Sequence, residues 1–531
     1  MADTRLRLKK NIYTLCFAAL SALDFVRNTQ NGDIWGTAVN VSGLVMLVII
    51  ASAWPLRELL TLPAAVWTLA CAALCVYAPV SIRSTGMDVF CGMYIWTFVT
   101  AVANVWWIAL FLARLLKRLR REGKPLRKPG KLAYMWVLMS VLMVCSRSGR
   151  IWPVWFLAMF GIFYLTPYDR QDSRALARGL IDGTILGFFG LQIFAYGFRP
   201  YDVVRYVGAF ANSNMAALHY LIVYAALLMK LHELQQQGAS RWWKLFYLTG
   251  ACGMLGFMFM TMGRTSWGIA ILLTLVYGIL VMRRIWRQKW GQIVARGAAL
   301  TLGMVLLFPA VFGTARWLPT ILHHPVWFLD EYSIDKVHSF DPPDSWKYVE
   351  MDEFLDAVFG RIWRTFQAGV KDPLVLVAEA AQQDDSSPEE LEVAGSENMD
   401  TSLRIRLSIY KAYFQNLNML GHGPSEGMFQ FKDQPYHAWH AQNLWLEVAY
   451  RYGIPTGLLF IITTVWLLVR HIRRMRSANG LSRAVIPLLV CIVFFGYGTM
   501  EVVWNLGQYI LILFFVVQHP LFYQEPFYQE S

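Results

Sequence analysis

Two histidines stand where an apolar segment of this sequence begins, and their side chains could exchange protons there. His437 and His440 end a long polar segment, and an apolar stretch that runs to about Arg470 follows them directly. Imidazole has an unperturbed pKa of about 6.5, so it suits proton transfer near neutral pH. A His-x-x-His pair can also bind a metal, but no third ligand suggests itself. We therefore expect no metal site.

Several arginines lie at similar boundaries, and guanidinium groups match the oxygens of phosphates. Arg264 lies in a very short turn between two apolar runs, and Arg404 and Arg406 lie in a segment with helical spacing. Each also has a simpler explanation. Arg264 can anchor a hairpin by extending along the membrane surface, and Arg404 and Arg406 can be solvated surface residues.

A third polar stretch, residues 205–217, precedes another apolar run. It contains Arg205, Asn212 and Asn214. The two amides could contact a sugar, or one of them could cap the helix that follows.

The composition indicates a polytopic helical membrane protein. Of the 531 residues, 56% are hydrophobic and 16% are charged, and the mean hydropathy is +0.40. The apolar runs are about as long as the ~20 residues that a helix needs to cross the hydrocarbon layer. We predict an all-α transmembrane bundle of about 12–14 spans. They lie near residues 11–27, 35–53, 59–81, 88–113, 132–146, 151–167, 180–198, 214–230, 245–262, 266–282, 297–314, 441–469, 484–498 and 503–518.

The basic residues predict the topology of this bundle. With the N-terminus in the cytoplasm, the basic connectors fall on the inner side and carry about 30 of the 48 Lys and Arg, as the positive-inside rule expects. They are residues 114–131, 170–178, 230–244, 283–296 and 470–483. The net charge of +13 therefore reflects membrane topology, and we expect no nucleic-acid partner. The first apolar run has no small-residue cleavage site and is expected to stay as a span. All seven cysteines fall within predicted spans, which argues against a disulfide framework.

One extracytoplasmic loop is much larger than the others and contains about 20 of the 35 acidic residues. Residues 344–370 predict an amphipathic helix that lies on the membrane or caps the bundle. Residues 379–402 are acidic and expected to be mobile, and residues 403–418 predict a further helix. The chain thus divides into N-terminal spans (1–200), spans with outer arginine loops (201–314), the large loop (315–440) and C-terminal spans (441–531).

A series of short motifs follows along the chain: Arg-x-x-Gly-x-Phe-x-Asn-x-Asn (205–214), Gly-Arg-Thr-Ser-Trp (263–267), Arg-x-x-x-Tyr (406–410), Leu-Gly-His-Gly-Pro (420–424), and His-x-x-Asn (440–443) followed by Gly-Ile-Pro-Thr-Gly (453–457). In this order, the motifs resemble those of the O-antigen ligase and polymerase superfamily of bacterial membrane proteins. The likeness covers about residues 200–465. It implies inverting glycan transfer from an undecaprenyl-diphosphate carrier to an acceptor at the outer face of the cytoplasmic membrane, without a metal or another cofactor.

The resemblance also implies roles for individual residues. Arg264 and Arg406 would hold the diphosphate, with Arg205 as a third candidate, and His440 would orient or deprotonate the acceptor hydroxyl. The chain departs from the family pattern at Tyr410, where Trp is commoner, and at the extra Gln442 before the asparagine. Arg404 and His437 therefore stay open as alternatives. The possible substrate contacts are Asn212, Asn214, His437, Asn443 and Arg404.

The acceptor remains open at this stage. In ligases of this superfamily it is the lipid A core, in polymerases another carrier-linked repeat unit, and in related oligosaccharyltransferases a protein hydroxyl. A lipid-linked oligosaccharide flippase or another transporter is the alternative outside enzymes. Such a protein should have charged or broken helices near the bilayer midplane, and the sequence has few.

Overall fold

A computed structural model describes most of the chain. It covers residues 2–27, 32–55, 61–83, 91–121, 130–148, 152–196, 201–202, 205–210, 213–321, 351, 354–356, 358–360, 390–391, 401–423, 429–431, 437–438, 440–504 and 508–523. The helices, in chain order, are α1 (Ala2–Arg27), α2 (Gly32–Ala51), α4 (Leu62–Arg83), α5 (Cys91–Arg121), α6 (Lys131–Val144), α7 (Trp152–Leu165), α8 (Arg170–Tyr196), α9 (Ser213–Gln236), α10 (Arg241–Met260), α11 (Arg264–Val276), the π-helix η1 (Tyr277–Ile285), α12 (Trp290–Ile321), α16 (Thr401–Gln415), α17 (Leu444–Tyr452), α18 (Ile454–Arg474), α19 (Ala478–Gly498), α20 (Tyr509–Val517) and the 3₁₀-helix η3 (Pro520–Tyr523).

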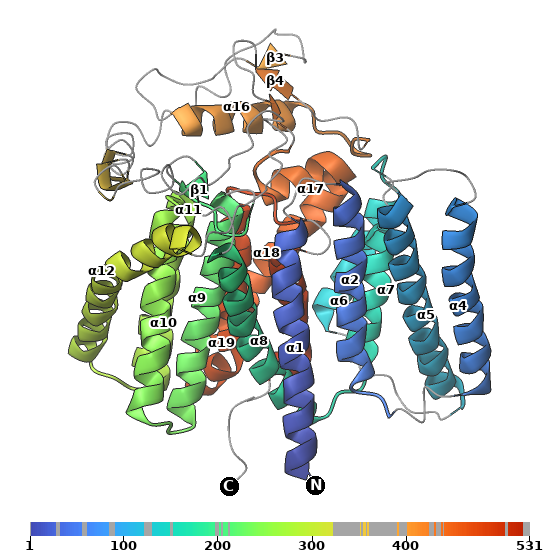
Figure 1. The fold of residues 1–531 in the computed structure, drawn as a ribbon, viewed down its shortest axis with the longest axis horizontal. Coiled ribbons are helices and arrows are strands. Elements are labelled where there is room, and N and C mark those ends of the chain that lie inside the picture. The colour runs from blue at the N-terminus through green and yellow to red at the C-terminus, as the bar shows by residue number, and fades with distance from the viewer. Residues whose placement is uncertain are drawn as a thin grey trace.

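The predicted all-α membrane bundle is confirmed. Within the described residues, eight helices are long and apolar enough to cross a membrane, and four apolar helices are shorter, with 10–17 residues. Most helices lie side by side, while α16 and α17 cover the end of the bundle that is farthest from the start of α1 (Figure 1). Every span expected from the sequence overlaps a helix.

Strands are few and very short. β1 (Tyr201–Asp202) pairs antiparallel with β2 (Arg205–Tyr206). In the large loop, β4 (Phe429–Phe431) pairs in parallel with β3 (Glu390–Leu391) and antiparallel with β5 (His437–Ala438). These pairs join loop segments to one another and form no layer of their own.

The span predicted over residues 441–469 is wrong in one respect, because the structure divides it into α17 and α18. The helix stops at Gly453, which has a φ of 91°, and Pro455 in the first turn of α18 has no backbone N–H to continue the helical ladder. The apolar pattern runs through this break, so hydropathy alone predicted a single span where the structure has two helices. By contrast, the predicted split of the last apolar block is confirmed, since α19 ends at Gly498 and α20 begins at Tyr509.

Helices α1 and α8 pack unusually closely along a row of glycines. A Cβ atom at Gly183 would lie 2.5 Å from the carbonyl oxygen of Thr14 and 2.7 Å from the Cβ of Phe17. In a bilayer, where lipid is as apolar as the helices, such close backbone approach is a main source of helix association. The glycines therefore fix α8 against α1, and α9 packs on α8 in turn.

Acidic residues neutralise some of the basic residues that the sequence assigned to topology. Lys9 on α1 pairs with the buried Asp172 on α8. Lys230 on α9 lies 2.8 Å from Asp182 and 2.9 Å from Glu233. Burial of an ion is tolerated when a partner of opposite charge accompanies it. These basic residues thus connect three helices besides favouring the inner side.

Only part of the large loop is described. Phe354 and Val358, from the predicted amphipathic helix, are buried, and the Phe354 ring lies 5.5–5.9 Å from those of Phe259, Phe308 and Phe312. This segment packs on α10 and α12, in line with a cap on the bundle. The other apolar positions of that prediction, Trp346, Val349, Ile362 and Phe366, lie outside the described residues, as does most of the acidic stretch 379–402. The helix predicted over 403–418 is confirmed as α16.

Replacing Gly183 by alanine should destabilise the bundle, because the new methyl group would press on the backbone of α1. We expect a lower thermal midpoint in detergent, equivalent to about 1–3 kcal/mol for an overpacked site. Gly190→Ala on the same helix is the matched control, since a Cβ there meets nothing within 4 Å. Equal midpoints for the two variants would contradict the packing argument.

Candidate functional site

A backbone clamp attaches the large loop to the end of the bundle that is farthest from the start of α1 (Figure 1). Gly421 has a φ of 74°, and a Cβ there would lie 2.2 Å from the carbonyl oxygen of Arg451. A Cβ at Gly453 would lie 2.3 Å from the carbonyl oxygen of Met419. The N–H of Ile454 donates to Asn418 O at 2.9 Å across the same junction. Only glycine combines this backbone conformation with such close approach.

His422 strengthens the clamp. Its ring stacks on Tyr450 with the centroids 3.8 Å apart, and the backbone N–H of His422 donates to the carbonyl oxygen of Arg451 at 3.2 Å. The Leu-Gly-His-Gly-Pro motif thus has a structural part to play. It holds the end of α16 against α17 and so sets where Arg406 lies.

A tight turn at residues 440–443 brings His440 to the start of α17. The Asn443 side chain caps this helix by accepting the N–H groups of Trp445 and Leu446, both at 3.1 Å. The carboxylate of Glu447 accepts the N–H of Ala441 at 2.8 Å. The neighbouring Gln442 adopts a φ of 49°. Asn443, expected as a possible substrate contact, therefore has a capping function in this structure.

The imidazole of His440 also takes part in this turn. The N–H of Gln442 donates to His440 Nδ1 at 3.3 Å. When Nδ1 accepts, the neutral ring carries its hydrogen on Nε2. The turn therefore favours an imidazole that presents an N–H at Nε2.

Arg406 reaches the same turn from α16. Its Nε donates to the side-chain oxygen of Gln442 at 3.2 Å, and a terminal nitrogen lies 3.9 Å from Glu501. The hydroxyl of Tyr410, one helical turn later, lies 3.1 Å from the backbone oxygens of both Gln442 and Thr499 and can donate to either. The residue that replaces the commoner Trp therefore links the turn to the end of α19.

Arg205 and Asn214 approach from the other side. Arg205 donates from Nε to Thr261 O and from a terminal nitrogen to the side-chain oxygen of Asn214, both at 3.0 Å. Asn214 in turn donates to Glu501 Oε1 at 2.8 Å. A continuous series of polar contacts thus runs from Arg205 through Asn214 and Glu501 to Arg406.

Glu501 lies at the centre of this series of polar contacts, in the short connection between the spans expected over residues 484–498 and 503–518. Its side chain is buried, and it lies just beyond the end of α19. Burial raises the pKa of this carboxyl above its ordinary value. A protonated His440 would oppose this effect, as do the charges of Arg406 and Arg205 and the hydrogen bond from Asn214. The only sequence signal was a carboxylate between two apolar runs.

Not all expected site residues can be related to this cluster. Arg264 begins α11, three residues after the Thr261 carbonyl that Arg205 binds, and its side chain is half-buried. The side chains of Arg404 and His437 lie outside the described residues, as does all of Asn212. His440, Arg406, Arg205 and Asn214 are the expected residues that the structure brings together.

A comparison with known families agrees with the likeness of the motifs. Residues 249–461 match the family model described as O-antigen ligase. The chain carries an O-antigen ligase domain. No curated protein and no solved structure gives a significant match. The matched region includes Arg264, Arg406 and His440, whereas Arg205, Asn214 and Glu501 lie outside it.

The O-antigen ligase domain agrees with the chemistry that this cluster can perform. The family implies a glycosyltransferase-type ligase that acts on lipid-linked glycans in a bacterial membrane. Guanidinium and imidazole groups at the end of a membrane bundle can contact an anionic headgroup while its lipid stays among the helices. A buried carboxylate among them limits their net charge.

Glu501→Gln should raise the stability of the protein at neutral pH. Because the folded protein raises the pKa of Glu501, folding favours the protonated form, and ionisation reduces the free energy of unfolding. Wild-type stability should therefore fall as pH rises from the ordinary Glu range through the raised pKa. Glutamine mimics the protonated form, so the gain in thermal midpoint should be largest above this window and vanish below it.

The matched control is Glu447→Gln, the other buried carboxylate of this region. Its carboxylate accepts Ala441 N–H and pairs with Arg451, so the variant should lose stability. Thermal unfolding in detergent between about pH 4 and pH 8 measures both effects. A Glu501→Gln protein that is less stable than wild type at pH 8 would contradict the assigned cost of ionisation.

Proposed function

We propose that this protein transfers a glycan from an undecaprenyl-diphosphate carrier to an acceptor hydroxyl at the outer face of the cytoplasmic membrane, as an O-antigen ligase. The observation that carries the proposal is the set of contacts that runs from Arg205 through Asn214 and the buried Glu501 to Arg406, which also bonds to Gln442 in the turn that carries His440. The O-antigen ligase domain over residues 249–461 supports it.

The transfer needs one bond to form and one to break. The acceptor oxygen attacks the anomeric carbon of the glycan, and the bond from that carbon to the diphosphate oxygen breaks. Attack opposite the leaving group inverts the anomeric centre. The hydroxyl proton must leave the acceptor, and negative charge accumulates on the diphosphate. Preorganised cations stabilise that charge far better than water does.

The contacts of the arginines support different roles for them. Arg406 contacts the neutral Gln442, the sulfur of Met500 at 3.4 Å, and Glu501 only at 3.9 Å. Such weak contacts are easily exchanged for phosphate oxygens, so Arg406 is proposed to bind the diphosphate. Arg205 makes two hydrogen bonds of 3.0 Å inside the protein. It is better suited to position Asn214 and Glu501, with Arg264 as the second proposed diphosphate ligand.

His440 is proposed to act on the acceptor hydroxyl. With hydrogen on Nε2, the ring can donate to the acceptor oxygen and orient it for attack. Taking the proton on Nε2 requires the other tautomer, which breaks the contact from Gln442 N–H. The contact from Gln442 N–H therefore favours a resting His440 that orients the acceptor hydroxyl. The ring takes up the proton only after this contact breaks.

His440→Ala and Arg264→Ala should each abolish glycan transfer without unfolding the protein. In cells with matched membrane levels, each variant should accumulate carrier-linked glycan and lower surface glycan by about a hundredfold or more. Arg476→Ala serves as a control. This exposed arginine follows the last residue of α18, at the end of that helix opposite to the candidate site. Variants that make surface glycan like wild type would overturn the proposed transfer.

The length of the accumulated glycan identifies the acceptor class. A ligase that fails leaves long chains on the carrier, because polymerisation precedes its step. A polymerase that fails leaves single repeat units. Single units in the His440→Ala strain would replace the ligase assignment with that of a polymerase.

Arg406→Ala should impair transfer, whereas Arg404→Ala should retain it. Both residues lie on α16, so the two variants remove the same charge from the same helix. Arg406→Lys should restore little activity, because an ammonium group cannot reproduce the planar fork of guanidinium. Transfer by membranes supplied with lipid-linked glycan is the measurement. A stronger loss in Arg404→Ala would reassign the diphosphate ligand.

A further inference from the structure

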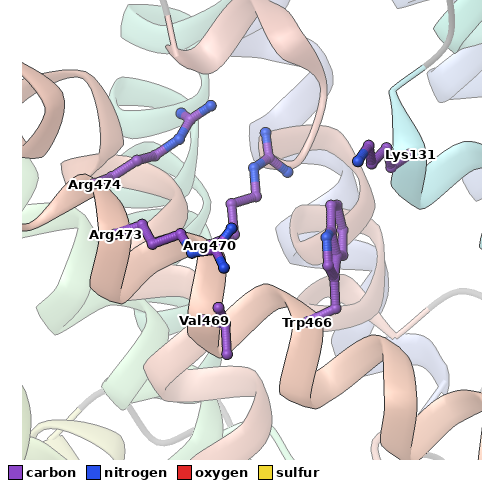
Figure 2. A pocket seen from close by; sticks show the side chains of 6 residues that line it. All are labelled: Lys131, Trp466, Val469, Arg470, Arg473 and Arg474. Atoms are coloured by element: carbon purple, nitrogen blue, oxygen red, sulfur yellow. The ribbon is translucent and has the colours of Figure 1, made fainter.

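A second cluster of cations surrounds a cavity at the opposite end of α18 from the candidate site. The cavity has a volume of about 400 Å³. Figure 2 shows the side chains that line it: Lys131 from α6 and Trp466, Val469, Arg470, Arg473 and Arg474 from α18. The lining residues of α18 lie 12–20 positions after its first residue, so about 18–30 Å separate this cavity from the start of the helix. The two sites are therefore distinct.

Aromatic rings hold two of these cations in place. The guanidinium of Arg474 lies 3.6 Å from the ring centroid of Tyr523, and that of Arg470 lies 4.0 Å from the same ring. Arg470 is also 5.4 Å from the ring of Trp466. Stacking on a ring fixes a guanidinium but uses none of its N–H donors. Both groups therefore keep hydrogen-bond donors for a ligand.

Among the residues that the structure describes, these four cations have no acidic partner. Within the described part of the chain, no carboxylate forms an ion pair with Lys131, Arg470, Arg473 or Arg474. Arg470 and Arg474 are also one helical turn apart, a spacing at which like charges repel each other. Arginines that served only topology could point apart into water. In this structure the four cations instead line one cavity, and an anion bound there would reduce their mutual repulsion.

We propose that this cavity binds the phosphate headgroup of an anionic phospholipid from the inner leaflet. The charge rule places this end of α18 at the cytoplasmic surface, where anionic lipid headgroups lie. Arg470, Arg474 and Lys131 contact the phosphate oxygens. The proposal concerns lipid binding alone and does not depend on glycan transfer.

The surroundings of the cavity favour a lipid over free phosphate. Val465, Leu468, Val469 and Ile472 are all exposed on α18, with 38–58% of each side chain accessible. This apolar face adjoins the cavity, so the acyl chains of a bound lipid can lie along it. Trp466 lines the cavity between the two regions, at the level where indole rings favour the membrane interface.

The test measures the thermal midpoint of the purified, delipidated full-length protein in neutral detergent. Phosphatidylglycerol, phosphatidylcholine or sodium phosphate is added over a range of concentrations. Phosphatidylglycerol should raise the midpoint of wild type in a saturable manner. The double variant Arg470→Gln/Arg474→Gln should need at least about tenfold more of this lipid for the same rise in midpoint. Lys131→Gln, which leaves the stack on Tyr523 intact, should weaken the response in the same direction. Arg476→Gln removes a nearby arginine outside the cavity and should respond like wild type.

Each alternative result overturns the proposal. An equal response to phosphatidylcholine would mean that no headgroup charge is recognised. Saturation by sodium phosphate at similar concentrations would replace the lipid with a free anion. If the double variant does not fold, an unchanged response of Lys131→Gln would still count against the site. An equally weakened Arg476→Gln protein would indicate general surface charge instead of a cavity.

Discussion

A buried carboxylate beyond the end of α19 is the constraint on which the candidate site depends. Glu501 can remain ionised there only if donors and cations surround it, because burial disfavours the charged form. Asn214 donates to it directly, and Arg406 and Arg205 act on it through their charge, as His440 would when protonated. These residues come from distant parts of the chain. Their convergence follows from one electrostatic requirement as well as from the packing of the helices.

Backbone geometry then determines where these groups lie. The glycines at positions 421 and 453 let the end of the large loop cross the junction of α17 and α18 within hydrogen-bonding distance. This crossing holds α16, and hence Arg406, over the turn that carries His440. Glu447 stabilises the same turn, because its carboxylate accepts the N–H of Ala441. These contacts hold the side chains of Arg406 and His440 at the same turn, although 33 residues lie between them in the sequence.

Hydropathy predicted the helices well because lipid and protein interior both require apolar helices with satisfied backbones. It did not predict the break at Gly453, since the apolar pattern continues through it. The spacing to Tyr410 favoured Arg406 over Arg404, but the contacts of Arg406 with Gln442 and Glu501 are visible only in three dimensions. Glu501 was missed for a similar reason: a single carboxylate between apolar runs resembles an ordinary connector.

The carboxylate also bears on how such a site could release its product. Arginines without a compensating charge would bind a diphosphate strongly before and after transfer, and tight binding of both states does not accelerate the reaction. Glu501 competes with the diphosphate for Arg406, since both are anions within reach of one guanidinium. The arginine thus has a partner to return to when the carrier diphosphate leaves. At the other end of α18, the stacked arginines have no such carboxylate among the described residues, which suits a ligand that stays bound.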